Sequence, residues 1–326
     1  MIKQLAVASL ACMALLCGAA HGQGAADYPN RPVSIVAPSQ PGGGFDLMGR
    51  AMAEGLGRQF PGKSFVVENR TGSGTLLGTQ FVAQSAPDGH TLLVGGLSNL
   101  VFNAALYKSP QYDPRHDFTT IGLVATYPYV LIARAGLPAN SYAELLALIK
   151  AKPDELSIAT GGPGSGQHIL AAAFIKATGG KLTLIPYRGA QAAYQDLLGG
   201  RIDLFIDVLP TIRPHLDSKR VKALAVTSSK RLAALPEVPT VKELGLPALE
   251  AGSWFGLVAP GKTPAPIVER LRKALATAMA EPELKSRLEK SGVDVLSLSV
   301  PAADAFIKSE YDKWTGFIRQ AGITIE

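Results

Sequence analysis

Short strand-like apolar runs alternate with amphipathic helical patterns along this chain, and that order restricts the fold more than any other feature of the sequence. The first series predicts strand, helix, strand, helix and strand at Val33–Ala37, Asp46–Phe60, Phe65–Glu68, Thr75–Gln84 and Thr91–Val94. Strands that alternate with helices in this way form parallel sheets covered by helices. The sequence therefore predicts an α/β domain.

The same alternation starts again after Pro138 and predicts a second α/β unit. Its predicted elements are helix Ser141–Ala151, strand Leu156–Thr160, helix Gln167–Thr178, strand Leu182–Pro186, helix Ala190–Leu198, and strands Ile202–Val208 and Val221–Val226. Two apolar strands, Ile121–Ala133 and Trp254–Ala259, are placed to cross between the units, and helices Ile267–Ala280, Pro282–Ser291 and Pro301–Ala321 close the chain. We therefore predict domain 1 at residues 27–126 and 251–326, and an inserted domain 2 at residues 127–250.

The first 26 residues have the features of a secretory signal peptide. Lys3 precedes the apolar stretch Leu5–Leu16, small residues follow at Ala19–Gly22, and the stretch is too short to span a membrane. Both cysteines, Cys12 and Cys17, lie here, so the exported chain would have neither a disulfide nor a thiolate metal site. The residues before Cys12 only loosely resemble a lipobox, which favours a soluble exported protein over a lipid-anchored one.

The charge balance is mildly basic and does not favour nucleic-acid binding. The chain has 32 basic and 26 acidic residues, and removal of Lys3 with the signal peptide leaves 31 basic residues without obvious clusters. Weak steering of a small anion is compatible with this balance, although many exported proteins are equally basic.

Four glycine-containing loops stand where a predicted strand ends and a predicted helix begins. They comprise residues 38–46, 70–75, 161–168 and 187–190. Consecutive glycines leave backbone N–H groups uncovered, and each following helix directs its positive end to the same place. A tight turn with positive φ would explain any one of these loops. Two belong to each unit, however, so we expect them to face one another across a cleft and to offer donors to a small anion.

Several side chains in these loops have two interpretations. Asp46 either caps its own helix, which is favoured, or contacts a ligand. Arg188 either grips a carboxylate or is a solvated charge beside a turn, and the residues alone favour the second. His168 has no partner at metal-ligand spacing, so we favour a local hydrogen bond and expect neither a metal nor a cofactor. Ser165 lacks the G-x-S-x-G frame of a hydrolase nucleophile.

Two segments match the nucleotide-binding pattern G-x4-G-K-[ST], at residues 57–64 and 256–263. The first follows a helix and precedes a strand, which is the reverse of the required order. In the second, Leu257–Ala259 is predicted to be a strand where the phosphate loop should lie, and Pro260 and Pro264 lack N–H donors. We therefore do not expect nucleotide binding.

Taken together, short segments from Tyr28 to Ile323 resemble the Bug-type receptors, the extracytoplasmic solute-binding proteins associated with tripartite tricarboxylate transporters. The matching segments are Tyr28–Pro32, Pro41–Gly44 with Asp46 and Arg50, Val67–Arg70, Pro87–Leu93, Tyr112–Pro114, Gly164–His168, Pro186–Gly189, Leu197–Gly200, Ala223–Thr227, Val238–Thr240 and Ser253–Gly256. The resemblance implies a type II periplasmic-binding-protein fold, in which two α/β domains with mostly parallel sheets, joined by crossing strands, close on a small organic carboxylate.

The same resemblance implies a periplasmic monomer that catalyses no reaction and delivers its solute to membrane transporter subunits or to a sensor kinase. Carried over residue by residue, it implies ligand contacts at Ser39, Gln40, Gly43, Gly44, Asp46, Ser73, Gly74, Thr75, Leu76, Ser98, Thr160, Ser165, His168, Tyr187, Arg188, Gly189 and Asp207. Two alternatives from other classes are an exported α/β enzyme, such as a hydrolase that uses Ser165, and an adhesion protein, which would need an exposed apolar patch.

Three positions depart from the family pattern. Ser39 stands where the family commonly has Phe, Phe45 where it often has Thr or Ser, and Thr75-Leu76 where it often has Gly-Asn. Phe45 and Leu76 would make one wall of the site more apolar. The sequence therefore predicts a carboxylate with an apolar or aromatic body rather than citrate or aspartate.

Overall fold

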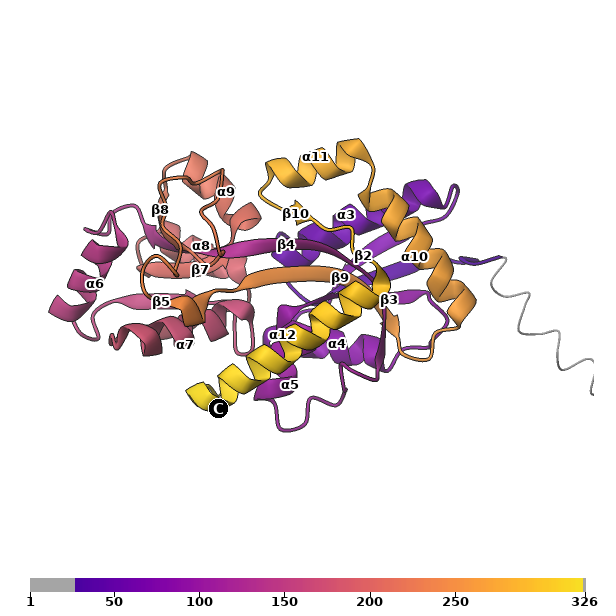
Figure 1. Ribbon diagram of the computed structural model, residues 1–326, viewed down its shortest axis with the longest axis horizontal. Coiled ribbons are helices and arrows are strands. Elements are labelled where there is room, and N and C mark those ends of the chain that lie inside the picture. Colours follow the sequence, from indigo (N-terminus) through magenta and orange to yellow (C-terminus); the bar gives the residue numbers. More distant parts are fainter. Residues whose placement is uncertain (1–26, 325–326) are drawn as a thin grey trace, which may run out of the picture.

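The computed structural model describes residues 27–324, so the predicted signal peptide, with both cysteines, lies outside the described residues. Figure 1 shows two α/β lobes side by side along the long axis of the molecule, joined by the long strands β4 (Phe118–Arg134) and β9 (Gly252–Pro260).

The first lobe is built on three parallel strands in the order β2-β1-β3, followed by the antiparallel strand β9. Ile35 of β1 lies between Val67 of β2 and Leu92 of β3 in the register of the sheet. Helix α3 packs on β1, β2 and α10. The elements of this lobe are β1 (Val33–Ala37), α3 (Gly44–Gln59), β2 (Phe65–Asn69), η1 (Ser73–Thr75), α4 (Leu76–Ala83), β3 (Thr91–Gly96), η2 (Ser98–Phe102), α5 (Asn103–Leu106), α10 (Ala265–Met279), α11 (Pro282–Lys290) and β10 (Asp294–Val295).

The second lobe repeats this plan with three parallel strands in the order β6-β5-β7, and β4 runs antiparallel beside β7. Strand β8 pairs with the other edge of the same part of β4. The elements of this lobe are α6 (Tyr142–Ala151), β5 (Ser157–Thr160), α7 (Gly166–Thr178), β6 (Thr183–Pro186), α8 (Ala190–Leu198), β7 (Leu204–Val208), α9 (Leu209–Asp217), β8 (Val221–Val226) and η3 (Pro247–Leu249).

Strand β4 links the two lobes. Its residues 118–128 pair with β9, whereas residues 129–133 pair with β7. Helix α12 (Val300–Ala321) lies across this junction and contacts β4, η2, α5 and α7. Its Trp314 is buried and packs edge to face on Phe102, with 5.2 Å between ring centroids, so the last helix belongs to the core.

The predicted elements are confirmed, most of them to within two residues at either end. The sequence missed α9, the helical turns η2 and α5, and the short strand β10. Helix α9 contains Pro214 in its interior, and proline normally argues against a helix, which explains why this one was not predicted. The domain boundaries near residues 126 and 250 stay a prediction.

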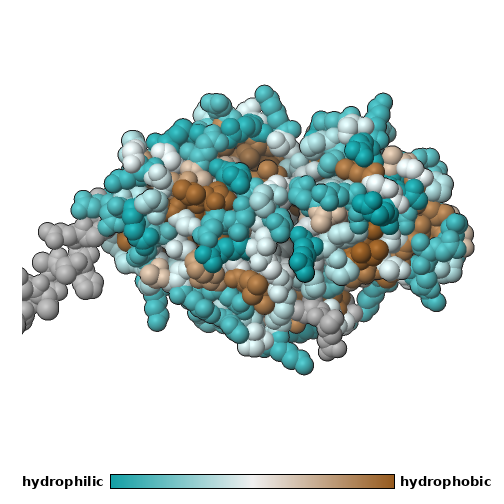
Figure 2. Space-filling model, turned by 180° about the vertical axis from the view of Figure 1, so that it is seen from behind, coloured by the Kyte–Doolittle hydropathy of each residue, from teal (hydrophilic) through white to brown (hydrophobic). Residues whose placement is uncertain are grey.

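The surface is largely polar. Seen from behind, polar residues cover most of the molecule and apolar residues form separate groups (Figure 2). Among the described residues, the large apolar side chains that are exposed, Leu47, Val66, Leu77 and Leu298, lie on four different segments. None of the helices in this part of the chain is long and apolar enough to cross a bilayer.

Candidate functional site

A cavity of about 270 Å³ lies between the lobes, and all four predicted loops contribute to its wall. Each loop leads into a helix: α3, η1 with α4, α7, or α8. The wall is formed by Pro38, Ser39, Gln40, Gly43, Gly44, Phe45, Thr71–Thr75, Ser98, Tyr129, Gly161–Pro163, Ser165, Gln167, Tyr187–Ala190, Asp207, Val208, Ser253 and Phe255. The loops therefore surround one cavity, as their spacing along the sequence suggested.

Most of the predicted ligand-binding residues lie in this wall. Those that do are Ser39, Gln40, Gly43, Gly44, Ser73, Gly74, Thr75, Ser98, Ser165, Tyr187, Arg188, Gly189 and Asp207. Asp46, Leu76, Thr160 and His168 are buried behind it and do not line it. Which of the lining residues touch a ligand stays a prediction.

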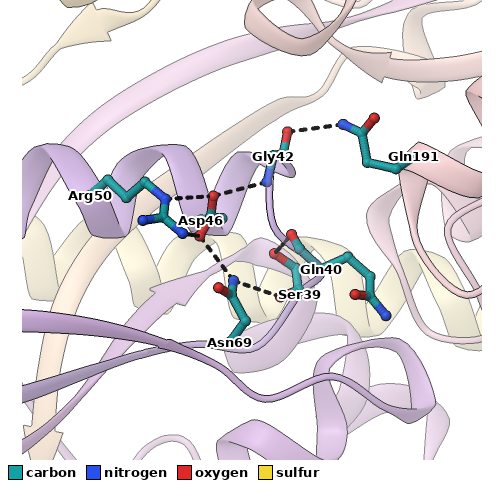
Figure 3. Close-up of polar contacts among 7 residues, drawn as sticks. All are labelled: Ser39, Gln40, Gly42, Asp46, Arg50, Asn69 and Gln191. Carbon is teal, nitrogen blue, oxygen red and sulfur yellow. Dashed lines mark hydrogen bonds and ion pairs between the residues drawn. The ribbon is translucent and has the colours of Figure 1, made fainter.

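Asp46 holds the first loop through hydrogen bonds (Figure 3) and does not line the cavity. Its Oδ2 accepts hydrogen bonds from Gly42 N and Arg50 Nε, both 2.9 Å long, and its Oδ1 accepts one of 3.0 Å from Asn69 Nδ2. Asn69 also donates to Ser39 O, which ties the end of β2 to the same loop. Burial raises the pKa of Asp46, but these hydrogen bonds outweigh it, so the pKa lies below its ordinary value. The favoured expectation that Asp46 caps its own helix is wrong, because Gly43 is the N-cap of α3 and no side chain caps this helix. Asp46 instead holds the loop that precedes the helix.

Thr160 and His168 support the loop before α7. Gly162 N donates to Thr160 Oγ1 at 3.3 Å, and Gly164 N donates to His168 Nδ1 at the same distance. Burial lowers the pKa of His168, which favours the neutral ring. The local hydrogen bond expected for His168 is present, and no group of metal-ligating side chains occurs among residues 27–324.

The first lobe presents backbone donors to the cavity. The first N–H groups of α3, at Gly44 and Phe45, have no acceptor within the described residues, because the first turn of a helix lacks one. In η1, Ser73, Gly74 and Thr75 have φ angles of 45°, 59° and 87°, and their N–H groups likewise have no acceptor in this part of the chain. Positive φ is costly for a β-branched residue such as Thr75, and such strain gathers at binding sites.

The second lobe adds the beginnings of α7 and α8. Ser165 caps α7 by accepting a hydrogen bond from His168 N at 3.1 Å, and Gly189 precedes α8. The hydroxyl of Ser165 is therefore engaged with a backbone amide, while the His168 ring accepts from Gly164 N. Among residues 27–324, these contacts do not give Ser165 the histidine base of a Ser-His-Asp triad.

Two charged residues line the cavity, Arg188 and Asp207. Arg188 is exposed and has no ion pair or hydrogen bond with any other described residue. Asp207 is 2% exposed, and burial raises its pKa, although hydrogen bonds from Val208 N, Thr211, Gln167 and Tyr194 oppose the shift. The cavity therefore offers an unpaired cation at its rim and a fully hydrogen-bonded carboxyl in its floor.

Part of the wall is aromatic. Phe45 packs edge to face on Phe255, with 4.8 Å between ring centroids, and Phe255 in turn lies 4.9 Å from Tyr127. The sequence prediction of an apolar wall is thus met by Phe45, whereas Leu76, the first residue of α4, is buried and does not line the cavity.

The lobes touch on either side of the cavity. Gly166 N donates to Ser98 Oγ at 2.9 Å, and Gln191 Nε2 donates to Gly42 O at 3.4 Å. Backbone also meets backbone between the lobes, since a Cβ placed on Gly74 would overlap Pro163 O. Only glycine fits at position 74 with the lobes in this arrangement.

Sequence reasoning missed Tyr129, Gln167, Ser253 and Phe255, which also line the cavity. Tyr129, Ser253 and Phe255 come from β4 and β9, and residues two apart on a strand share a face. The prediction that these strands cross between the units could have identified them. Gln167 lies within a predicted loop, and only its contact with Asp207 distinguishes it.

The two nucleotide-binding patterns do not form phosphate loops. Residues 57–64 join the end of α3 to β2, and residues 256–260 lie in β9. The predicted helix-to-strand order of the first segment and the predicted strand in the second are confirmed.

Residues 48–323 match the family described as tripartite tricarboxylate transporter family receptor. The protein BugT of Bordetella pertussis is 34% identical over 300 residues, which cover 92% of each chain. The solved structure of the periplasmic binding protein BugD is 37% identical, with a TM-score of 0.86 over 91% of this chain and 99% of that one. The predicted two-domain periplasmic-binding-protein fold is confirmed by this similarity.

Two other similar structures were solved with acids. An R. palustris protein with adipate is 32% identical, with a TM-score of 0.87 over 91% of this chain and 99% of that chain. MatC from Rhodopseudomonas palustris with bound malate is 31% identical, with a TM-score of 0.85 over 89% of this chain and all of that one.

Proposed function

The chain belongs to the tripartite tricarboxylate transporter receptor family, and from that premise we propose that it captures a small organic carboxylate in the cavity between its lobes. The observation that carries this proposal is the set of N–H groups without acceptors at the beginnings of α3 and η1, beside the cavity that the beginnings of α7 and α8 also line. Helix N-termini and successive free amides bind anions. Adipate and malate, the acids in two similar structures, support the same class of ligand.

Arg188 adds a charge that suits this ligand. It is the one cation among the residues that line the cavity, and it has no carboxylate partner within residues 27–324. A guanidinium binds a carboxylate through two parallel hydrogen bonds. The ligand carboxylate would therefore take the place of the missing ion-pair partner.

The aromatic part of the wall favours an acid with an apolar or aromatic body. Phe45 and Phe255 form a packed pair beside the α3 donors, and Gly44 lies against Phe255. An apolar body against these rings would be removed from water, which stabilises binding by about 25 cal/mol per Å². Citrate and aspartate offer little apolar surface to such a wall.

Closure of the lobes would couple binding to delivery. Loops from both lobes line the cavity, so a ligand contacts both only when the lobes are together, and this difference in affinity shifts the equilibrium to the closed form. The proposed receptor is a periplasmic monomer, exported by the N-terminal segment, that presents its ligand to membrane transporter subunits or a sensor kinase and catalyses no reaction.

A thermal-shift screen of the purified protein tests the proposal. The panel contains aromatic and aliphatic monocarboxylates, dicarboxylates, citrate, aspartate and ATP. A ligand at 100 times its Kd stabilises the folded state by about 2.7 kcal/mol, so a carboxylate should raise the Tm by several degrees. If ATP alone raised the Tm, the proposed function would be wrong, and preference for citrate or aspartate would refute the apolar body.

Two variants locate the binding. Gly43→Val should weaken the affinity for the best acid, because its side chain would come within 3.3 Å of Ser39 Oγ and Gln40 O and cover the α3 donors. Gly57→Val in the same helix has open space around it and should leave the affinity unchanged, as should Lys63→Ala at an exposed turn. Equal affinities in all three variants would place the ligand elsewhere.

A further inference from the structure

Gln167 has its side-chain amide fixed by a buried carboxyl. Its Nε2 donates to Asp207 Oδ1 at 2.9 Å, and the two residues lie 40 positions apart in the sequence. Gln167 and Asp207 both line the cavity. The contact therefore joins the beginning of α7 to the end of β7 within the wall.

The surroundings of Asp207 determine which end of the amide faces the cavity. Asp207 Oδ1 also accepts from Val208 N at 2.8 Å, and its Oδ2 accepts from Tyr194 Oη at 3.0 Å and from Thr211 Oγ1 at 2.8 Å. A carboxylate surrounded by donors is an acceptor, so the group of Gln167 that it contacts is the NH2 group. The Oε1 atom is directed away from Asp207.

In this arrangement the side-chain oxygen of Gln167 is an acceptor without a hydrogen-bond donor. Both oxygens of Asp207 are occupied, whereas Gln167 Oε1 has no donor among the described residues and is not fully enclosed. A Cβ placed on Gly161 would lie 3.1 Å from this oxygen, and Gly161 is itself part of the wall. A fixed acceptor therefore stands in a cavity that otherwise offers mainly donors.

We propose that Gln167 determines specificity by accepting a hydrogen bond from a hydroxyl or amine group that the ligand carries in addition to its carboxylate. The inference rests on the proposed function, because it assumes that the carboxylate occupies the amide donors of α3 and η1 or the guanidinium of Arg188. A second carboxylate at Gln167 would face the amide oxygen without a proton to share. The ligand class is thus a hydroxy or amino acid with an apolar body, in place of a simple dicarboxylate.

Pairs of acids that differ only in the donor test this proposal. Suitable pairs are 4-hydroxybenzoate with benzoate and 6-hydroxyhexanoate with hexanoate, each titrated into the purified protein by calorimetry. In at least one pair, the acid with the hydroxyl should bind about 10- to 100-fold more tightly, because a site built to accept this hydrogen bond leaves its acceptor unpaired with the other acid.

Substitutions test whether Gln167 is the residue that produces the ratio of affinities. Gln167→Met keeps the length of the side chain without the amide and should bring the ratio close to one, mainly through weaker binding of the hydroxylated acid. Asp207→Asn presents an amide that can donate to Gln167 Oε1 and so lets the Gln167 amide turn over, which should also lower the ratio. Gln195→Met removes an exposed glutamine of α8 outside the wall and should leave the ratio unchanged.

The outcomes separate this inference from the proposed function. If both members of every pair bind equally, or if Gln167→Met weakens both by the same factor, the role of Gln167 is refuted while carboxylate binding stands. If none of the acids binds, the proposed function and this inference fall together. A lowered ratio in both Gln167→Met and Asp207→Asn supports the inference even where one variant is less stable.

Discussion

The two walls of the cavity present different chemical groups to a ligand. The first lobe contributes backbone, because Gly43, Gly44 and the positive-φ residues Ser73–Thr75 present N–H groups with little side chain around them. The second lobe contributes side chains, with Arg188 at the rim and Gln167 fixed on Asp207. Backbone donors recognise any anion of suitable size, whereas fixed side chains can distinguish one acid from another. The proposed function therefore predicts that the first lobe contributes affinity through its backbone, whereas the second lobe adds a charge and a fixed acceptor that distinguish one acid from another.

The largest effect on affinity is expected from the point where the two walls meet. In Gly74→Ala the new Cβ would overlap Pro163 O, so the lobes cannot reach this arrangement without a shift of backbone. Overpacking of this kind costs about 1–3 kcal/mol, which predicts up to roughly 100-fold weaker binding.

Gly62→Ala is the matched control for Gly74→Ala, because Gly62 also has a positive φ, 76°, but open space around it. Both substitutions should lower the stability of the folded protein by a similar amount. Only Gly74→Ala should weaken the affinity measured by calorimetry and reduce the compaction on binding measured by X-ray scattering. Equal affinities in the two variants would show that the contact at Gly74 is not needed for binding.

The next largest effect is expected at Arg188, the charge of the second wall. Arg188→Gln should weaken binding of the best acid about 10-fold, since a hydrogen bond to a charged group contributes about 1.5–3 kcal/mol and solvent at the rim reduces it. The salt dependence of the Kd should also become weaker. Arg319→Gln removes the same charge from the exposed end of α12 and should leave both quantities unchanged; a loss of affinity there would point to long-range steering.

A smaller change, in the selectivity among acids, is expected at Phe45, the aromatic side chain that the first loop contributes to the wall. Phe45→Thr removes the ring that packs on Phe255 and should lower the preference for aromatic over short aliphatic acids about five- to tenfold. Competition titrations with benzoate and acetate would measure the ratio. An unchanged ratio would mean that the ligand body does not lie against this pair.

The smallest effect on affinity is expected at Asp46. Its contribution to folding stability should depend on pH in the opposite way to that of Asp207 in the other wall. The pKa of Asp46 lies below the ordinary value, so the ionised group stabilises the fold above about pH 4, and this contribution is lost as pH falls through the lower folded-state pKa. The pKa of Asp207 is raised, so its ionised form costs stability and protonation on acidification removes that cost.

Urea unfolding between pH 3 and pH 7 measures this contrast. The stability that Asp46→Asn loses relative to the unsubstituted protein should grow as pH rises from 3 to 5 and then stay constant. Relative stability of Asp207→Asn should instead increase with rising pH. The same trend in both variants would contradict the opposite shifts assigned to the two carboxyls.

The local pattern was sufficient to predict most of the fold. Periodicity placed β1 and β8 at their observed bounds and α8 at Ala190–Leu198, because amphipathic spacing is a property of neighbouring residues. It failed at α9, where Pro214 in the interior argues against the helix that packing against β4, β7 and β8 nevertheless stabilises. Local pattern is also insufficient for the site. A glycine loop can be recognised in the sequence, but the loop that faces it across the cleft cannot.

The sequence by itself determined the two α/β units, the four loops at the ends of their strands and the resemblance to a receptor family, since each depends on residues close together in the chain. Only the tertiary structure decided that Asp46 bonds Arg50 and Asn69 behind the wall, that Leu76 is buried and does not line the cavity, and that Gln167 is held by Asp207. These features join residues that are far apart in sequence, or depend on which way a loop turns, so hydrogen bonding and packing across the fold settle them.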